Sequence, residues 1–159
     1  ISLRFGTSEE VFMDKQERFE AAGKALAEAR ELNREEKMPI LVEGKRDARA
    51  LTALGFQGPI VLVNQGRPLS EVIAKLIESY PQKIILLMDW DRTGGRLQKE
   101  FRERLISLDR PIDESLRKTL SIVLTPESRV VEALYKMADL LKPIIDVHDR
   151  DGADEHPLL

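Results

Sequence analysis

The sequence predicts a Rossmann-like three-layer α/β/α domain with a mostly parallel four-stranded sheet, plus an N-terminal amphipathic helix. Short apolar runs, each of strand length, are dense in Ile, Leu and Val, as expected for strands that are buried on both faces. Helix-like segments between these runs are long enough to act as crossovers, and such alternation predicts a parallel sheet covered by helices. The four runs are residues 39–43, 59–63, 83–89 and 119–125.

The helices follow from periodicity. Apolar residues recur at spacings of three and four over residues 8–34, which predicts an amphipathic helix. Thr7 or Ser8, with Glu10 close behind, is its expected N-terminal cap. Further helices are expected over 46–54, 69–79, 94–108 and 128–141, the last ending before Pro143. The expected organisation is one unit made of an N-terminal helix (1–38), the α/β core (39–127), a C-terminal helix (128–147) and a flexible acidic tail (148–159).

Composition narrows the compartment and the partners. The chain lacks cysteine, which excludes disulfides and thiolate metal sites and agrees with a cytoplasmic location. No run approaches the roughly 20 apolar residues that span a bilayer, so no membrane contact is expected. The net charge of −3 argues against binding nucleic acid by bulk electrostatics alone. A polyanionic partner would have to be bound by local basic patches or through cations.

Polar and glycine-bearing segments follow three of the four predicted strands. Glu43-Gly44-Lys45 follows the first strand, Asn64 follows the second, and the segment 89–95 (DWDRTGG) follows the third. Binding sites in open parallel sheets form just beyond the carboxyl ends of the strands. The candidate functional residues are therefore expected at this edge.

The acidic residues at these strand ends suggest a metal site. Asp89 and Asp91 are one residue apart, so an extended backbone projects both carboxylates to the same side. Glu43 can join them, because neighbouring strands lie about 4.8 Å apart. Carboxylates that lie so close repel each other unless a cation neutralises them, and hard oxygen ligands select Mg²⁺ or Mn²⁺. The alternative is that the aspartates only cap the next helix.

Two segments resemble the motifs of one known family. The run ILVEGKRDARAL (40–51) resembles the first motif of the Toprim family, and IILLMDWDRTGGR (84–96) resembles the second. The resemblance covers about residues 39–127, somewhat over half the chain. It implies the Toprim fold, a general acid or base at Glu43, and Mg²⁺ bound by Asp89 and Asp91, with Glu43 close to the metal.

The resemblance also suggests residues that contact the substrate. Lys45 is a candidate for a phosphate contact or for stabilising transition-state charge, although a solvated loop lysine is the alternative. Gly44 and Gly94 would let the backbone approach the site closely. Asp47 either caps the following helix or pairs with a basic neighbour. Weaker candidates for substrate contacts are Asn64, Arg92 and Arg96, and Arg92 could equally pair with the aspartates.

The expected function is Mg²⁺-dependent phosphodiester chemistry on nucleic acid, as a small stand-alone nuclease or primase-like nucleotidyl transferase. RNA is favoured over DNA, on the resemblance alone. The alternative is a non-catalytic module that binds metal or nucleic acid within a larger complex. A protein partner or a homodimer stays open, because the first helix can bury its apolar face against the sheet or against a second copy.

Overall fold

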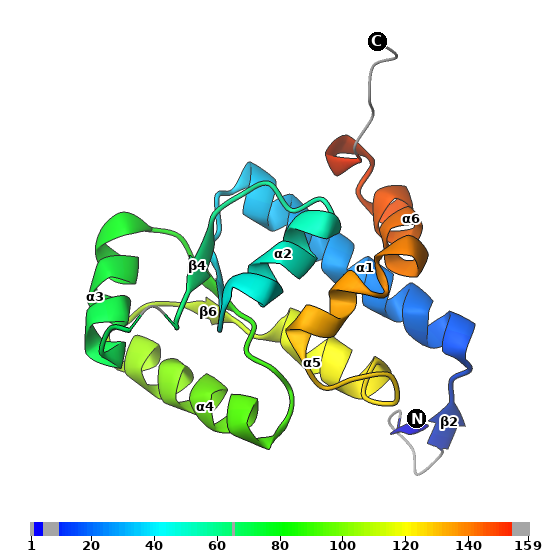
Figure 1. The fold of residues 1–159 in the computed structure, drawn as a ribbon, viewed down its shortest axis with the longest axis horizontal. Helices are drawn as coiled ribbons and strands as arrows, with labels where there is room; N and C mark the ends of the chain where they lie inside the picture. The colour runs from blue at the N-terminus through cyan, green and yellow to red at the C-terminus, as the bar shows by residue number, and fades with distance from the viewer. Residues whose placement is uncertain (1, 5–9, 65, 154–159) are drawn as a thin grey trace.

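The computed structural model describes residues 2–4, 10–64 and 66–153, with side chains from residue 13 onward (Figure 1). A short antiparallel ribbon precedes the α/β unit. No helix within these ranges is both long and apolar enough to cross a membrane. The elements are β1 (Ser2–Arg4), β2 (Glu10–Phe12), α1 (Lys15–Glu35), β3 (Ile40–Val42), α2 (Lys45–Ala53), β4 (Ile60–Leu62), α3 (Leu69–Ser79), β5 (Ile84–Leu86), α4 (Arg92–Ser107), β6 (Ile112–Asp113), α5 (Ser115–Val123), the 3₁₀ helix η1 (Val131–Tyr135), α6 (Ala138–His148) and the 3₁₀ helix η2 (Arg150–Gly152).

The main sheet has four strands in the order β4-β3-β5-β6, and every pair is parallel. Ile40 of β3 lies opposite Ile60 of β4 and Ile85 of β5, so the three strands are in register at one level. The residues of β3 and β5 are buried, as expected for central strands that are covered on both faces. The predicted parallel α/β fold is confirmed.

Side chains of successive strand residues point to opposite faces of the sheet and so build two cores. Ile40 and Val42 belong to the core that contains residues of α1, α2, α5 and α6, whereas Leu41 belongs to the core that contains residues of α3 and α4. Figure 1 shows α3 and α4 together at one side of the molecule and α1, α5 and α6 at the other. The sheet is therefore the middle layer of three.

The position of the fourth strand differs from the prediction. Residues 119–125 were expected to form it, but most of this run lies in α5, and the strand is the two-residue segment Ile112–Asp113. Leu116, Leu120 and Val123 lie three or four residues apart, and all three are buried. A short apolar run fits a buried helix as well as a buried strand, and here the helical period decides.

The first helix begins later than predicted. Residues 10–12 form β2, and α1 starts at Lys15. Its N-cap is Asp14, whose Oδ1 accepts a hydrogen bond from the Glu17 backbone N–H at 2.8 Å. The predicted caps Thr7 and Ser8 lie outside the described residues.

The C-terminal region also differs from the prediction. In place of one helix over 128–141, η1 is followed by α6, which contains Pro143. A proline inside a helix removes one backbone hydrogen bond, so tertiary contacts must stabilise α6. Leu141 and Ile145 of α6 are fully buried in the core that also contains residues of α1.

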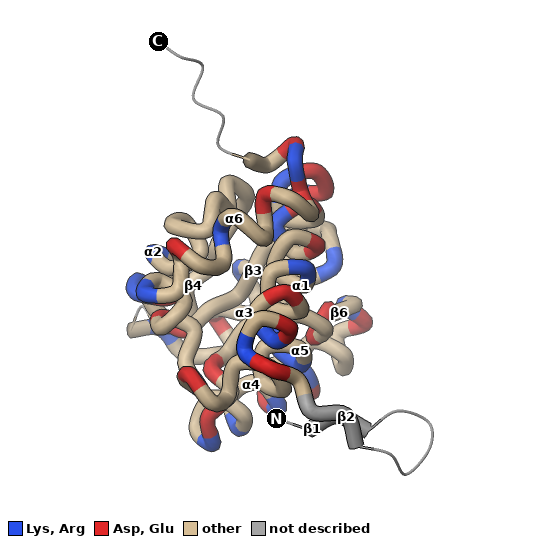
Figure 2. The backbone as a smooth tube through the Cα atoms, turned by 90° about the vertical axis from the view of Figure 1, so that its right-hand side faces the viewer, with Lys and Arg blue, Asp and Glu red and all other residues tan. Residues whose placement is uncertain are grey.

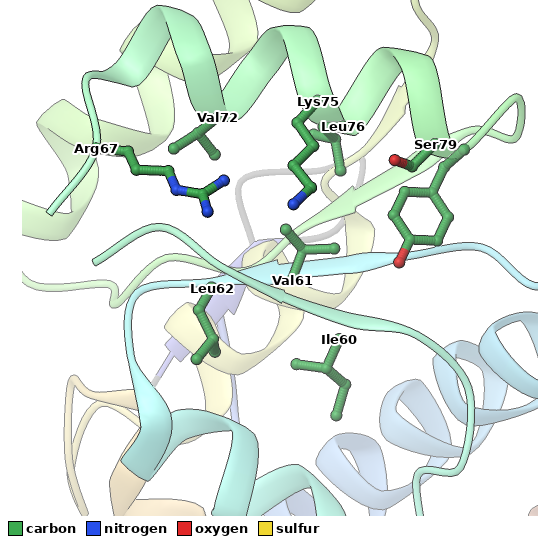
Figure 3. Close-up of a pocket in the computed structure, with 9 residues that line it drawn as sticks. Ile60, Val61, Leu62, Arg67, Val72, Lys75, Leu76 and Ser79 are labelled. Atoms are coloured by element: carbon green, nitrogen blue, oxygen red, sulfur yellow. The ribbon is translucent and has the colours of Figure 1, made fainter. Parts of the chain in front are cut away.

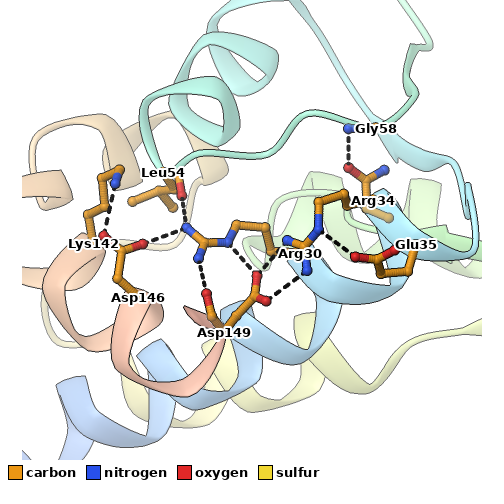
Figure 4. A network of polar contacts seen from close by, with 9 residues as sticks. Arg30, Arg34, Glu35, Leu54, Gly58, Lys142, Asp146 and Asp149 are labelled. Atoms are coloured by element: carbon orange, nitrogen blue, oxygen red, sulfur yellow. Dashed lines mark hydrogen bonds and ion pairs between the residues drawn. The ribbon is translucent and has the colours of Figure 1, made fainter. Parts of the chain in front are cut away.

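A buried arginine anchors the end of α6 to α1 (Figure 4). Arg30 is fully buried and donates to Asp149 Oδ2 at 2.7 Å, to the Asp149 carbonyl at 2.7 Å and to Asp146 Oδ1 at 2.8 Å. The same guanidinium donates to the Leu54 carbonyl, just past α2, at 3.0 Å. Within the segment expected to be a flexible tail, Asp149 is buried and residues 150–152 form η2.

Candidate metal and nucleic-acid site

The predicted acidic residues follow two neighbouring strands at the point where the chain changes direction across the sheet. From β3 the chain crosses to β4 on one side, and β5 then pairs with β3 on the other side. Such a reversal of strand order opens a crevice at the carboxyl ends of the strands. Glu43 directly follows β3, and Asp89 lies three residues beyond β5.

Glu43 is positioned by both neighbouring strands. Its carbonyl accepts from the Asn64 backbone N–H at 2.8 Å, and its Oε2 accepts from the Asp89 backbone N–H at 2.9 Å. The Asn64 side chain itself is exposed. In the described part of the chain, Glu43 Oε1 has no hydrogen-bond partner, so it can contact a ligand.

Asp89 is half-buried among other acidic groups. Burial, the largest cause, and the negative charges of Glu43, Asp47 and Asp91 together raise the pKa of its carboxyl to about 7. Its Oδ1 accepts from the Val131 backbone N–H of η1 at 2.8 Å, which opposes the rise. Sequence reasoning missed Val131, because a backbone donor has no signature in the sequence.

Asp91 and Gly94 shape the start of α4. Asp91 Oδ1 accepts from the Gly94 backbone N–H at 2.8 Å, so the predicted capping role is present. A Cβ on Gly94 would lie 2.0 Å from the Asp89 carbonyl oxygen, a distance that only glycine permits. A Cβ on Gly44 would meet nothing within 4 Å. The backbone thus packs closely against Asp89 at Gly94, while open space lies beside Gly44. The predicted approach of a ligand to these two glycines stays a prediction.

The remaining predicted residues are one buried carboxylate, Asp47, and three exposed basic side chains. Asp47 Oδ2 accepts from the Gly44 backbone N–H at 3.0 Å, which supports the capping interpretation, and burial raises the pKa of Asp47. Lys45, the first residue of α2, is exposed. Arg92 and Arg96 are also exposed, and neither forms an ion pair with any residue that the structure describes. The internal pairing of Arg92 with the aspartates is thus not found there.

Arg117 of α5 is the arginine that contacts the third strand end. Its Nε donates to the Met88 carbonyl at 3.1 Å, and its Nη2 donates to the Asp89 carbonyl at 3.0 Å. Burial lowers the pKa of its guanidinium. We did not predict this contact, because residues 119–125 were assigned to a strand. The helical spacing of Leu116 and Leu120 is the signal that could have placed Arg117 on a helix.

The donor set fits a hard divalent cation in type and in charge. Glu43, Asp89 and Asp91 offer only carboxylate oxygens, which Mg²⁺ prefers. A cation would offset the mutual repulsion that contributes to the raised pKa of Asp89. With the side chains as they lie, no three acidic or histidine residues in the described ranges surround a single point closely enough to ligate a metal. Ligation of one ion by all three carboxylates would therefore require side-chain rotation.

Comparison with known proteins identifies the family of this chain. The family model of the Toprim domain matches residues 39–122, so the chain belongs to the Toprim domain family. Two archaeal relatives then specify the group. The chain is 32% identical over 109 residues to a UPF0292 protein of Pyrococcus furiosus, covering 69% of this chain and 80% of the relative. It is 32% identical over 127 residues to a UPF0292 protein of Methanocaldococcus jannaschii, and this match covers 77% of this chain and 94% of the relative. The chain thus falls within the UPF0292 group.

A solved structure of a protein from Aquifex aeolicus shares the fold, with a TM-score of 0.55 and 28% sequence identity. The match covers 70% of this chain and 93% of that one, so the likeness extends over nearly the whole of a small protein. Membership of the Toprim family assigns the chain to the metal-binding domains that take part in nucleic-acid processing.

Proposed function

We propose that this protein is a Mg²⁺-dependent enzyme that hydrolyses phosphodiester bonds in nucleic acid, with RNA as the favoured substrate. In this proposal, Asp89 and Asp91 bind the metal and Glu43 transfers the proton. The observation that supports it best is the hydrogen bond of 2.9 Å from the Asp89 N–H to Glu43 Oε2. This bond brings the candidate base and the first candidate metal ligand together just beyond the carboxyl ends of β3 and β5.

The chemistry follows from the groups at this edge. Glu43 accepts a proton from a water molecule while the water oxygen attacks phosphorus. The bond from phosphorus to the leaving nucleotide oxygen breaks, and that oxygen takes a proton, giving a phosphate monoester and a hydroxyl. Lys45 is exposed at the start of α2 and can stabilise charge on the phosphate oxygens. Mg²⁺, when bound, supplies further neutralisation of the phosphate charge.

The test compares the wild type with Glu43→Gln and Asp89→Asn on labelled RNA, single-stranded DNA and nucleoside triphosphates, with Mg²⁺ or Mn²⁺. Glu71→Gln, an exposed position in the first turn of α3, is the matched control for the change at Glu43. We expect Glu43→Gln to lower turnover by about 100-fold or more, the usual contribution of general acid–base catalysis. Glu71→Gln should leave turnover unchanged.

Several outcomes would contradict hydrolysis. If both site variants turn over every active substrate as fast as the wild type, Glu43 and Asp89 have no catalytic role. Incorporation of nucleoside triphosphates without cleavage would support nucleotidyl transfer in its place. A wild type that binds nucleic acid but turns over none of the substrates would favour the non-catalytic module.

A further inference from the structure

A basic cleft lies beside the carboxylates, between α2 and η1. It has a volume of about 320 Å³, and its lining includes Arg46, Arg49, Tyr135, Lys136 and one carboxylate, that of Glu132. Arg46 and Lys136 are exposed and form no ion pair with any described residue. The cleft therefore offers cationic groups to a ligand rather than to the protein.

Both walls of the cleft are joined to the candidate site. The α2 wall begins two residues after Glu43, and Arg46 and Arg49 lie on one face of this helix because they are three residues apart. The η1 wall is attached by the hydrogen bond of 2.8 Å from the Val131 N–H to Asp89 Oδ1. A chain that lies in the cleft can thus continue to the carboxylates.

Tyr135 gives the cleft an aromatic surface. The Arg49 guanidinium carbon lies 4.1 Å from the centre of the tyrosine ring, and Arg49 Nη2 donates to the tyrosine hydroxyl at 2.8 Å. Tyr135 is nevertheless 43% exposed. A positive groove that carries an aromatic ring is the arrangement that binds single strands, because phosphates contact the cations and an unpaired base stacks on the ring.

We propose that this cleft binds a single strand of nucleic acid, with phosphates at Arg46 and Lys136 and a base stacked on Tyr135. The inference deepens the proposed function, and it rests on that function for the claim that the strand leads to a reacting centre. The charges of the whole molecule do not favour any polyanion. The net charge is −3, and Figure 2 shows acidic and basic residues interspersed around the backbone. Binding must therefore depend on a local surface.

A second basic groove provides the matched control. It has a volume of about 290 Å³ and runs between the edge strand β4 and α3, and Figure 3 shows Arg67 and Lys75 directed into it. This groove follows the outer edge of the sheet, whereas the carboxylates lie between β3 and β5. The double variants Arg46→Gln/Lys136→Gln and Arg67→Gln/Lys75→Gln remove the same charge from different surfaces.

Binding can be measured by fluorescence anisotropy with labelled oligonucleotides of roughly 12 residues, as RNA, DNA and duplex, in EDTA and over a range of salt. We expect Arg46→Gln/Lys136→Gln to reduce the slope of log affinity against log salt by about 1.4 for single strands, from ~0.7 per lost phosphate contact. Arg67→Gln/Lys75→Gln should leave the slope unchanged. RNA and DNA are separate arms, because phosphates and stacked bases are common to both.

Variants at Tyr135 measure the contribution of base stacking separately from that of charge. Tyr135→Ala should weaken single-strand binding by about tenfold or more, whereas Tyr135→Phe, which keeps the ring, should bind within about twofold of the wild type. Thermal unfolding of each variant checks that the fold is retained. The proposal is overturned if the Arg67 and Lys75 variant loses as much binding as the cleft variant, if Tyr135→Ala binds like the wild type, or if duplex binds as tightly as single strands.

The cleft proposal and the proposed function can be refuted independently of each other. Binding is measured without metal and so does not depend on catalysis. If the cleft variants lose affinity while Glu43→Gln turns over substrate as fast as the wild type, the hydrolase proposal is refuted and the cleft proposal is supported. Glu43-dependent turnover combined with wild-type binding by the cleft variants would refute the cleft and leave the hydrolase intact.

Discussion

Replacing Asp149 by Ala should destabilise the fold far more than its place near the C-terminus suggests. The Asp149 carboxylate accepts two hydrogen bonds of 2.8 Å from Arg34 and one of 2.7 Å from Arg30, and Arg30 is fully buried (Figure 4). Among the residues that the structure describes, the substitution leaves the buried Arg30 with Asp146 as its one acidic partner. Breaking a buried ion pair by removing one partner typically costs about 3–5 kcal/mol, and we expect a loss of this order.

Part of this loss depends on pH. Pairing with Arg34, and then with Arg30, lowers the pKa of the Asp149 carboxyl from its ordinary 3.8 to about 2. This difference corresponds to about 2 kcal/mol at ~1.36 kcal/mol per pKa unit. Because the pKa is lower in the folded state, this stabilisation is fully present above pH 3.8 and is lost as the pH falls toward 2. The gap in stability between the wild type and Asp149→Ala should narrow over that range.

Urea unfolding at pH 7 and at several values down to pH 2.5 measures both effects. Asp151→Ala is the control, because Asp151 is exposed and lies only two residues away. We expect this control to stay within about 0.5 kcal/mol of the wild type, as exposed substitutions usually do. If Asp149→Ala is equally mild at pH 7, or if its deficit is the same at every pH, the ion-pair network does not stabilise this region.

Two further predictions concern the carboxylate edge. Gly94→Ala should destabilise the fold by about 1–3 kcal/mol in urea unfolding, because its Cβ would meet the Asp89 carbonyl. The control Gly95→Ala should cost less than about 1 kcal/mol or stabilise α4. Equal losses of stability in the two variants would contradict the steric argument. Asp89→Asn should be more stable than the wild type at pH 8 in EDTA, since the raised pKa means that the ionised carboxyl weakens the fold above pH 7. The difference in unfolding free energy between Asp89→Asn and the wild type should shrink as the pH falls toward 4. If Asp89→Asn is less stable than the wild type at pH 8, this prediction is wrong.

The central strands could be predicted because their burial on both faces is visible in their own residues. β3 and β5 are apolar throughout because both faces are covered, and a continuous apolar run is the pattern of such a strand. β6 has no comparable pattern. It consists of Ile112 and Asp113, and only its pairing with β5 makes it a strand. A two-residue element is too short for periodicity to reveal.

The candidate site shows the same division. Glu43 and Asp89 could be placed at one edge from the sequence, because parallel strands bring their carboxyl ends together. Contacts made through backbone atoms could not be predicted. The Val131 N–H that binds Asp89 is a group that every residue type except proline carries, and the carbonyls that accept from Arg117 are present in all of them. Only the path of the chain after α5 brings the Val131 N–H to Asp89, at the third strand end.

That path makes the segment beyond the Toprim match part of the candidate site. The match ends at residue 122, yet the Trp90 backbone N–H donates to the Arg129 carbonyl at 2.9 Å, and the Trp90 indole donates to the Ser128 carbonyl at 2.9 Å. These bonds fix the turn between Asp89 and Asp91 from outside the matched region. The same segment continues through η1 into α6, whose end is anchored by the Arg30 and Asp149 pair. Loosening that anchor should therefore weaken the support of Asp89 as well as the fold, because both depend on one continuous stretch of chain.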